Sequence, residues 1–310
     1  MIVILNPAAG GGSALAKWRR IESCVRQRVG PFRLVVAEGP ADVKAAVAAA
    51  LRNGENEFIA AGGDGMVNLV LTAILEGAPS GTLARVKLGA VGLGSSNDFH
   101  KPLSRERMID GIPLRLDFVA TVAHDVGLLT YRDEADNLQS RRWIINASVG
   151  TTAEANHFFN QPNRTLRALK RLLPAWGMAY AALRTILTYR SRRMTLTLDE
   201  AETVRARVKN LGVVKNPHFT GSLCYGSPYE PGSGHFYVHL LRNVSFPRLA
   251  LTLFGLLRGR FHGNGGAQSW RATKLRVEAD APFAVEGDGE VVVTSRAYFS
   301  VVPGLIRVCT

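Results

Sequence analysis

The stretch EFIAAGGDGMVN, residues 57–68, decides the architecture of the first part of the chain. Its first residues, Glu57–Ala61, have the length and apolar content of a buried strand. Three glycines around Asp64 follow, and Met66–Leu75 continues with the apolar spacing of a helix. A strand, a glycine-rich turn and a helix in this order are typical of a sheet that binds ligands where its strands end.

The same alternation extends on both sides of this stretch. We expect further strands at Ile2–Leu5, Arg33–Val36, Lys87–Val91 and Leu114–Ala120, and further helices at Ala14–Arg28 and Ala41–Arg52. Alternating strands and helices favour an open, mainly parallel sheet with ligands at the carboxyl ends of its strands. We therefore predict an α/β domain over residues 1–118.

After Asp117 the pattern changes to longer strands separated by polar turns. We expect strands at His124–Thr130, Arg142–Ser148, Met194–Leu198, Val204–Val214, His235–Leu241, Thr273–Ala279 and Ala297–Val302. A helical hairpin broken at Pro174 is expected over Thr165–Tyr189, and an amphipathic helix over Ser245–Gly259. Residues 119–310 are thus predicted to form a mainly antiparallel β domain with helical insertions, whose last residues can pack back on the first domain.

The composition is that of a globular protein. With 310 residues and 46% hydrophobic content, the chain can bury a substantial core. Cys24, Cys224 and Cys309 lack the close spacings of zinc sites, redox motifs or disulfide frameworks, which favours a reducing, cytoplasmic compartment. The start of the chain lacks the features of a signal peptide, and the longest lipophilic stretches are shorter than the roughly 20 residues that span a bilayer. We expect a soluble protein.

The formal net charge of +13 favours a polyanionic partner. Nucleic acid, anionic lipid and nucleotide phosphates all qualify on charge alone. Basic residues scattered over the surface for solubility would give the same total, so charge does not decide between these alternatives.

Two glycine-rich turns follow strands in the first domain. The loop NPAAGGGS, residues 6–13, can turn backbone amides toward a phosphate at the start of a helix. The loop AGGDGMVN, residues 61–68, presents Asp64 to a metal ion, a water or a hydroxyl. An ordinary flexible turn for the first loop and a helix cap for Asp64 are the structural alternatives.

Two further turns carry polar groups. The segment GLGSSNDF, residues 92–99, offers two hydroxyls, an amide and a carboxylate at the same edge of the sheet. The segment EGDGE, residues 286–290, places Asp288 and Glu290 late in the second domain, where Asp-Gly is also a strong hairpin signal.

In this order, the four segments resemble those of the diacylglycerol kinase catalytic-domain family, which includes bacterial lipid kinases and sphingosine kinases. The segments NASVG, residues 146–150, and NPHFTGS, residues 216–222, extend the resemblance over nearly the whole chain. The Gly-Gly-Asp-Gly element alone is shared with NAD kinases and phosphofructokinases. The resemblance therefore depends on all the segments together.

The resemblance implies a two-domain fold, similar to NAD kinase and phosphofructokinase in its first domain, with ATP in the cleft between the domains. It implies that the nucleotide is bound by Asn6, Gly10, Gly11, Gly12, Gly62, Gly63, Asp64, Gly65, Met66, Asn68, Ser95 and Asn97. Asp64 and Asp98 would organise Mg²⁺ and its waters, and Asp64, Asp288 and Glu290 would be catalytic. Asp288 and Glu290 would place or supply the base for a lipid hydroxyl.

The chain departs from the family pattern at several positions. Met66 stands where Thr is usual, and it cannot donate a hydroxyl hydrogen bond to phosphate. Ala37 replaces a common nucleotide-contacting Thr, and Gly92 replaces a usual Pro. Residues Ser233 and Gly234 occupy the place of an Asp-Gly pair that holds a structural divalent ion in several bacterial relatives. That ion site is expected to be absent or altered.

We expect an ATP-dependent lipid kinase that acts at a membrane surface as a cytoplasmic, peripheral enzyme. The partners implied are ATP and a lipid such as diacylglycerol, with no nucleic acid. An NAD kinase-like enzyme and a catalytically weak nucleotide-binding regulatory protein are the alternatives. The sequence leaves open the identity of the lipid, the identity of the base, and the oligomeric state, including a homodimer.

Overall fold

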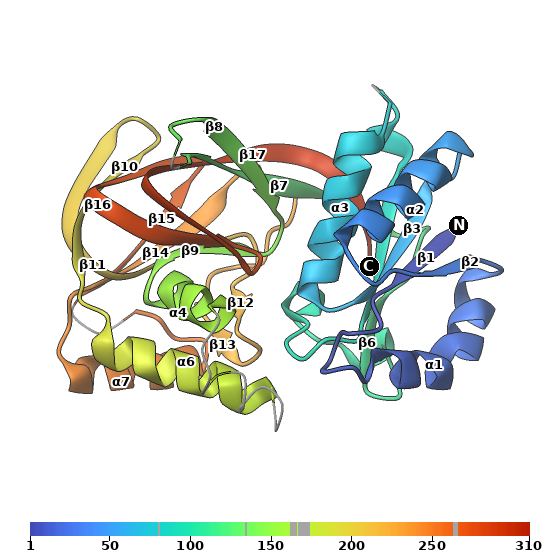
Figure 1. Cartoon of the computed structure of the whole chain (residues 1–310), viewed down its shortest axis with the longest axis horizontal. Helices are drawn as coiled ribbons and strands as arrows, with labels where there is room; N and C mark the ends of the chain where they lie inside the picture. Colours follow the sequence, from blue (N-terminus) through green and yellow to red (C-terminus); the bar gives the residue numbers. More distant parts are fainter. Residues whose placement is uncertain (80, 134, 162–165, 167–173, 263–265) are drawn as a thin grey trace.

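The computed structural model describes residues 1–79, 81–133, 135–161, 166, 174–262 and 266–310. Figure 1 shows two lobes side by side, an α/β lobe that contains both chain ends and a β-rich lobe. Long strands run between the two lobes.

Parallel strands form the centre of the N-terminal lobe. They are β1 (Ile2–Leu5), β2 (Arg33–Val36), β3 (Glu57–Gly62) and β4 (Lys87–Gly92), in the spatial order β2-β1-β3-β4. Each neighbouring pair is parallel. Between them lie helices α1 (Ala14–Val29), α2 (Pro40–Arg52) and α3 (Asp64–Gly77). All these elements lie within two residues of their predicted ends.

Side chains that alternate along the strands divide this lobe into two apolar layers. Ile2 and Ile4 of β1 pack into a cluster with α2 and α3, whereas Val3 and Leu5 pack with Trp18 of α1. The helices therefore cover both faces of the sheet and leave the carboxyl ends of β1, β3 and β4 at one edge. Ligands bind at this edge in sheets of this kind.

A short antiparallel hairpin, β5 (Met108–Ile109) and β6 (Ile112–Arg115), extends the sheet from β4. Single 3-10 turns lie at η1 (Leu83–Arg85), η2 (Asp98–His100) and η3 (Arg105–Arg107). The predicted strand Leu114–Ala120 is wrong beyond Arg115. Asp117 accepts hydrogen bonds from the N–H groups of Val119 and Ala120 at 2.9 and 2.8 Å, which forms a turn in place of a strand.

The β-rich lobe consists mainly of antiparallel strands. They are β7 (Thr121–Arg132), β8 (Leu138–Trp143), β9 (Asn146–Gly150), β10 (Arg192–Leu198), β11 (Glu202–Val214), β12 (His218–Phe219), β13 (Leu223–Cys224), β14 (Phe236–Arg242), β15 (Ala267–Ala272), β16 (Lys274–Gly287) and β17 (Glu290–Cys309). Their inward side chains form a second core around Trp143, Phe236, Phe283 and Phe299.

Strand β17 joins the two lobes (Figure 1). It pairs antiparallel with β16 and β7, and its last residues, Arg307 and Val308, pair in parallel with Lys87 and Leu88 of β4. One sheet therefore continues through the molecule in the order β15-β14-β11-β10-β16-β17-β4-β3-β1-β2.

The single strand predicted over Arg142–Ser148 is wrong, because β8 ends at Trp143 and β9 begins at Asn146. At the break, the N–H groups of Ile144, Ile145 and Asn146 donate hydrogen bonds to the carboxylate of Asp288 at 2.7, 3.0 and 3.0 Å. The buried carboxylate thus replaces the strand partners that these N–H groups would otherwise need.

In the described part of the chain, three helices accompany the β-rich lobe: α4 (Thr151–Asn160), α6 (Pro174–Thr188) and α7 (Phe246–Leu256). The second arm of the predicted hairpin corresponds to α6. Its first arm lies outside the described residues, apart from Leu166. The predicted helix Ser245–Gly259 ends earlier, and Gly259 follows it with a positive φ of 67°.

A buried ammonium group lies beside Ser233 and Gly234, where an absent or altered ion site was expected. Lys215 Nζ donates hydrogen bonds to Asp125 Oδ2 and the His235 carbonyl, both at 2.6 Å, and to the Glu230 carbonyl at 3.1 Å. The Ser233 hydroxyl is a fourth acceptor at 3.2 Å. A carboxylate, two carbonyls and a hydroxyl around one cation form the donor set of a hard-cation site, and here the chain's own lysine supplies the charge.

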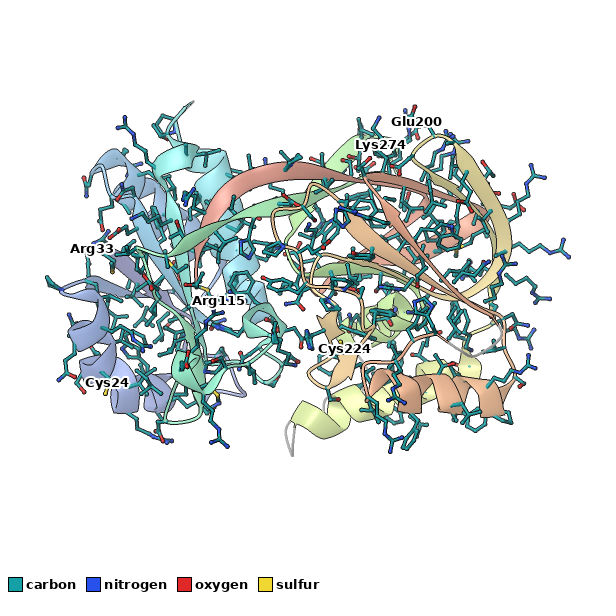
Figure 2. The ribbon with its side chains drawn as sticks, turned by 180° about the vertical axis from the view of Figure 1, so that it is seen from behind. Cys24, Arg33, Arg115, Glu200, Cys224 and Lys274 are labelled. Atoms are coloured by element: carbon teal, nitrogen blue, oxygen red, sulfur yellow. The ribbon has the colours of Figure 1, made fainter. Side chains whose placement is uncertain are left out.

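All three cysteines of the sequence are described, and all are free. Figure 2 shows Cys24 in the N-terminal lobe and Cys224 in the β-rich lobe, far from each other. Cys309 is buried at the end of β17.

Candidate active site

A cleft of about 550 Å³ lies between the two lobes at the carboxyl ends of β1, β3 and β4. From the N-terminal lobe it is lined by Asn6, Ala9, Gly10, Gly63, Asp64, Gly65, Met66, Asn68, Leu69, Gly94, Ser95, Ser96 and Asp98. From the β-rich lobe it is lined by Ile145, Asn146, Thr152, Asn156, Phe219, Thr220, Glu286, Asp288, Gly289 and Glu290. Most of the predicted site residues therefore share one cleft. Gly11, Gly12, Gly62 and Asn97 do not line it.

The loop after β1 forms one end of the cleft. Gly10, Gly11 and Gly12 all have positive φ, at 60°, 69° and 87°, a conformation that favours glycine. Asn6 Oδ1 accepts a hydrogen bond from the Ala8 N–H at 2.9 Å and so fixes the start of the loop. A methyl group placed on Gly10 would lie 3.3 Å from Lys17 Nζ. This lysine on α1, which the sequence analysis missed, brings a cation to the loop.

The loops after β3 and β4 approach each other closely. A Cβ on Gly94 would lie 2.5 Å from the Gly63 Cα, so position 94 requires glycine, and a Cβ on Gly63 would lie 3.3 Å from the Gly94 Cα, a tight contact. The carboxylate of Asp64 accepts hydrogen bonds from the N–H groups of Asp98 and Phe99 at 3.0 and 2.9 Å, which joins the two loops. Burial raises the pKa of Asp64 to about 6, and the negative charges of Asp98 and Asp288 contribute to that rise.

Asn97 has a structural role in its turn. Its φ is 49°, its amide donates to the carbonyls of Gly92 and Gly94 at 3.1 and 3.2 Å, and its oxygen accepts the Gly94 N–H at 3.0 Å. These bonds shape the loop that presents Ser95 and Ser96 to the cleft.

Asp98 connects the two lobes. Its carboxylate is 2.6 Å from Lys101 Nζ and accepts the Gly221 N–H at 3.2 Å, while Lys101 also donates to the Gly221 carbonyl. The Asn216 amide donates to the Asp98 and Lys101 carbonyls, both at 2.9 Å. The lysine already neutralises Asp98, so this carboxylate does not fit the metal-ligand role expected of it.

Asp64 does fit a role in holding Mg²⁺. It lies between the glycine loops, accepts one backbone N–H on each oxygen, and experiences the charge of two other carboxylates. Asp98 is already paired with Lys101, so Asp64 is the carboxylate of these two loops that could hold a hard cation. Within the described part of the chain, no three His, Cys, Asp or Glu side chains form a ready metal cluster.

Asp288 lines the cleft and is half-buried. In addition to the three backbone N–H groups at the β8–β9 break, it accepts a hydrogen bond from Asn68 Nδ2 at 2.8 Å. Burial raises the pKa of Asp288 above its ordinary value, and the four N–H donors oppose that rise. Glu290, two residues later, is exposed at the rim and forms an ion pair with Arg141.

Glu286 lines the cleft although the sequence analysis gave it no role. Its side chain is buried, with Oε2 accepting the Ser148 hydroxyl at 2.7 Å and Oε1 accepting the Gly289 N–H at 2.5 Å. Burial raises the pKa of Glu286 to about 7. Glu286 lies two residues before Asp288, outside the Asp-Gly-Glu element to which the resemblance assigns a role.

Met66 and Ala37, two of the departures from the family pattern, are both buried in the core formed with α2 and α3. A Cβ on Gly62 would lie 2.6 Å from the Met66 Cβ, so the Met66 side chain packs against the end of β3.

A second, apolar cavity of about 380 Å³ adjoins the cleft. Thr152, Asn156, Phe219 and Thr220 line both spaces. The walls of the cavity otherwise come from α4, α6, α7 and the β11, β13 and β14 strands, and include Ala155, Phe159, Ala182, Ile186, Leu223, Tyr225, Leu241, Leu249, Leu253, Leu256 and Phe261. The cleft that carries the motif residues and this largely hydrocarbon-lined cavity therefore share part of their walls.

Comparisons with known proteins agree with this architecture. Residues 1–127 match the family model of the diacylglycerol kinase catalytic domain, and residues 146–310 match that of the YegS C-terminal NAD kinase β sandwich-like domain. The chain is 22% identical over 291 residues to a Streptococcus pneumoniae serotype 4 protein named "Putative lipid kinase", covering 93% of this chain and 90% of that protein.

Two solved structures from Bacillus anthracis share the fold. One, described as a "putative diacylglycerol kinase", superposes with a TM-score of 0.70 at 15% identity and covers 99% of this chain and 96% of its own. The other, described as a diacylglycerol kinase, has a TM-score of 0.67 at 12% identity and covers 99% and 95%.

Proposed function

Since the chain belongs to the diacylglycerol kinase catalytic-domain family, we propose that it is an ATP-dependent lipid kinase. In this proposal the γ-phosphoryl group of ATP passes to the hydroxyl of diacylglycerol or a related lipid. The observation that carries it is the apolar cavity that adjoins the motif-lined cleft and shares four lining residues with it.

The cavity fits the acyl part of a lipid. Pockets that take small apolar molecules are lined mainly by hydrophobic side chains, with a few polar groups that fix orientation. Here the polar groups lie at the shared boundary, where Thr152, Asn156 and Thr220 face both spaces. A chain held in the cavity would present its hydroxyl to the cleft.

Residues of the N-terminal lobe would bind the nucleotide. Glycines after β1, β3 and β4 let phosphates approach the backbone, and the start of α3 adds a favourable helix dipole. Asp64 would hold Mg²⁺, which when bound neutralises phosphate charge. Positioning and neutralisation of charge account for most of the catalysis of phosphoryl transfer.

We also propose that the protein works as a peripheral enzyme at the cytoplasmic face of a membrane, where ATP is available. Among the described residues, no helix has the length and apolar character to cross a bilayer. Large apolar side chains are instead exposed on α6 and α7: Leu183, Leu187, Phe246, Leu251, Phe254 and, directly after α7, Leu257. Figure 1 shows the two helices next to each other at one end of the β-rich lobe.

The opposite side of α7 faces inward. Leu249 and Leu256 are buried and line the apolar cavity, as does the partly buried Leu253. The helix thus separates the proposed lipid cavity from the surface that would lie on the bilayer, a suitable arrangement for a substrate that enters from the membrane.

The function is tested by incubating the purified protein with labelled ATP, Mg²⁺ and vesicles that contain diacylglycerol. Labelled phospholipid is expected. Labelled NADP⁺ from added NAD⁺ would favour an NAD kinase-like enzyme, and nucleotide binding without any turnover would favour a regulatory protein.

A matched pair of variants tests the cavity. Ala155→Phe on α4 should fill the cavity and abolish lipid phosphorylation while nucleotide binding persists. Asn160→Phe, at the exposed end of the same helix, should leave both unchanged. Normal lipid turnover by Ala155→Phe would contradict the assignment of the cavity.

A further inference from the structure

The reaction proposed above must move one proton from the lipid hydroxyl as its oxygen attacks the γ-phosphorus. Five carboxylates line the cleft, and four of them can be compared as proton acceptors: Asp64, Glu286, Asp288 and Glu290. Asp98 also lines it, but Lys101 neutralises that carboxylate.

Of these four carboxylates, Asp288 has the least capacity to accept a proton. Both of its oxygens already take two N–H donors each, from Asn68, Ile144, Ile145 and Asn146. Four donors that cannot reverse their direction favour the ionised carboxylate. Protonation of Asp288 would place its O–H group against an N–H donor, which is unfavourable. The four hydrogen bonds instead give Asp288 a structural role, in which it holds the β8–β9 break and the start of α3 in place.

Glu290 and Asp64 are unsuited as acceptors of the lipid hydroxyl proton for other reasons. Glu290 has a side chain 52% exposed at the rim, where its carboxylate is already paired with the Arg141 guanidinium. Asp64 lies in the opposite wall, between the glycine loops, where phosphate and its cation would be held.

Glu286 combines burial with unused acceptor capacity. Each of its oxygens accepts one hydrogen bond, from Ser148 Oγ or from the Gly289 N–H. A carboxylate oxygen can accept about two, so each keeps a further acceptor position. The Ser148 hydroxyl can also rotate, and it does not oppose protonation as a fixed N–H does.

The position of Glu286 also fits the path of the substrate. It lies on β16, which pairs with β9 through Glu286 and Ser148, and α4 follows β9 directly. Thr152 and Asn156 of α4 line both the cleft and the apolar cavity. Glu286 is therefore on the same side of the cleft as the cavity mouth from which a lipid hydroxyl would enter.

We infer that Glu286, outside the Asp-Gly-Glu element, is the catalytic residue that accepts the proton of the lipid hydroxyl. This inference rests on the proposed function. The hydroxyl oxygen forms a bond to the γ-phosphorus, the bond from that phosphorus to the β,γ-bridging oxygen breaks, and ADP leaves with the electron pair. The proton passes to a free carboxylate position of Glu286 and later to water.

The surroundings set the pH at which this carboxylate can act. Burial raises the pKa of Glu286 most, and the charge of Asp288 on the same turn raises it further. Tyr225 is the other titratable group that interacts with it, since the Glu286 charge raises the Tyr225 pKa. The turnover rate should therefore fall on the acid side with a midpoint near 7, because only the ionised Glu286 accepts a proton.

The test compares wild type, Glu286→Gln and Ser148→Ala over pH 5–9. Glu286→Gln keeps a similar shape and acceptor oxygen, and should lower kcat by about 10²- to 10⁴-fold with nucleotide affinity unchanged. The acid limb of the pH profile should disappear. Ser148→Ala removes a donor that lowers the Glu286 pKa, so its acid limb should move to higher pH.

Two results would overturn the inference. One is wild-type kcat in Glu286→Gln. The other is a slow variant whose acid limb is unchanged, which would mean that Glu286 only supports the turn.

A measurement that needs no turnover separates this inference from the proposed function. Infrared difference spectra between pH 5 and 9 should show two protonated carboxyl bands, and Glu286→Gln should remove the one with its midpoint near 7 and leave that of Asp64 near 6. A wild-type spectrum without a carboxyl that titrates near neutral pH would also overturn the assignment, whichever substrate the protein uses.

Discussion

The side-chain amide of Asn68 donates a hydrogen bond to Asp288 Oδ2 at 2.8 Å, across the cleft and across 220 positions of sequence. The same amide donates to the Arg142 carbonyl at 3.0 Å. Asn68 is on the first turns of α3 and Asp288 is in the β16–β17 turn, so this contact fixes the separation of the two walls of the site.

Replacing Asn68 by Ala should destabilise the protein by about 1.5–3 kcal/mol, because a buried carboxylate loses one of its donors. Urea denaturation measures this change. Thr72→Ala is the matched control on the same helix, since the Thr72 hydroxyl makes only a 3.4 Å contact with Asn68 Oδ1. Equal stability of the two variants would mean that the bond to Asp288 contributes nothing measurable.

Asp64→Asn should abolish phosphoryl transfer and keep the fold. The substitution removes the charge that would hold Mg²⁺ while changing little volume, and we expect turnover to fall by 10²-fold or more. Circular dichroism and a lipid kinase assay check the two parts. More than about a tenth of the wild-type rate would rule out a metal or base role for Asp64.

The raised pKa values of Asp64 and Glu286 predict how the free energy of unfolding depends on pH. In the fold the pKa of Asp64 rises from 3.8 to about 6 and that of Glu286 from 4.5 to about 7. Between pH 4 and 7 the folded protein therefore holds more protons at these groups than the unfolded chain. Their contribution to stability is present at low pH and is lost as the pH rises through the folded pKa values.

Glu286→Gln removes one of these two contributions. Its stability relative to wild type should rise between pH 4.5 and 7 and stay constant above about pH 8. Denaturation series at pH 5 and pH 8 measure this difference. A difference that does not change with pH would show that Glu286 keeps its ordinary pKa in the fold.

The buried pair of Lys215 and Asp125 should be costly to break from either side. Lys215→Met leaves the carboxylate of Asp125 without its cation, and we expect a loss of about 3–5 kcal/mol. The double variant Lys215→Met, Asp125→Asn should lose less than the sum of the two single variants. Strict additivity in this double-mutant cycle would show that the two groups are not coupled.

Membrane binding should depend on both charge and apolar side chains. Phe254 is 53% exposed on α7, with the Arg258 guanidinium 3.8 Å above its ring. Phe254→Ser should weaken vesicle binding at every salt concentration, whereas Arg258→Gln should weaken it mainly for anionic vesicles at low salt, by about 1 kcal/mol. Co-sedimentation with neutral and anionic vesicles distinguishes the two effects. Equal binding of wild type to both kinds of vesicle would exclude a role for the basic residues.

Local sequence was sufficient to predict the α/β lobe. Strands β1 to β4 and their helices follow from apolar spacing and glycine turns, and each lies within two residues of its predicted range. Features that depend on distant partners were not predictable. The break between Trp143 and Asn146 exists because of Asp288, more than 140 positions away, and an apolar run such as WIIN carries no sign of it.

The candidate site was predictable in part for the same reason. The motif residues gather at one edge because parallel strands end there, so Asn6, Asp64 and Ser95 share the cleft. Individual roles depend on contacts that motifs do not encode. The ion pair of Lys101 with Asp98 shows that the charge of this acid is already compensated. The burial of Glu286 likewise becomes visible only in the fold.

Strand β17 has a consequence for biosynthesis. Lys87 and Leu88 of β4 pair with Arg307 and Val308, which a ribosome adds more than 200 residues later. During translation β6 can already pair with Ala90 and Val91, but the Lys87–Leu88 part of the β4 edge stays unpaired, and an open edge can pair with other chains. When the protein is expressed rapidly, the yield of active protein should therefore be limited by the supply of chaperones that shield this edge or by the slow final docking of β17.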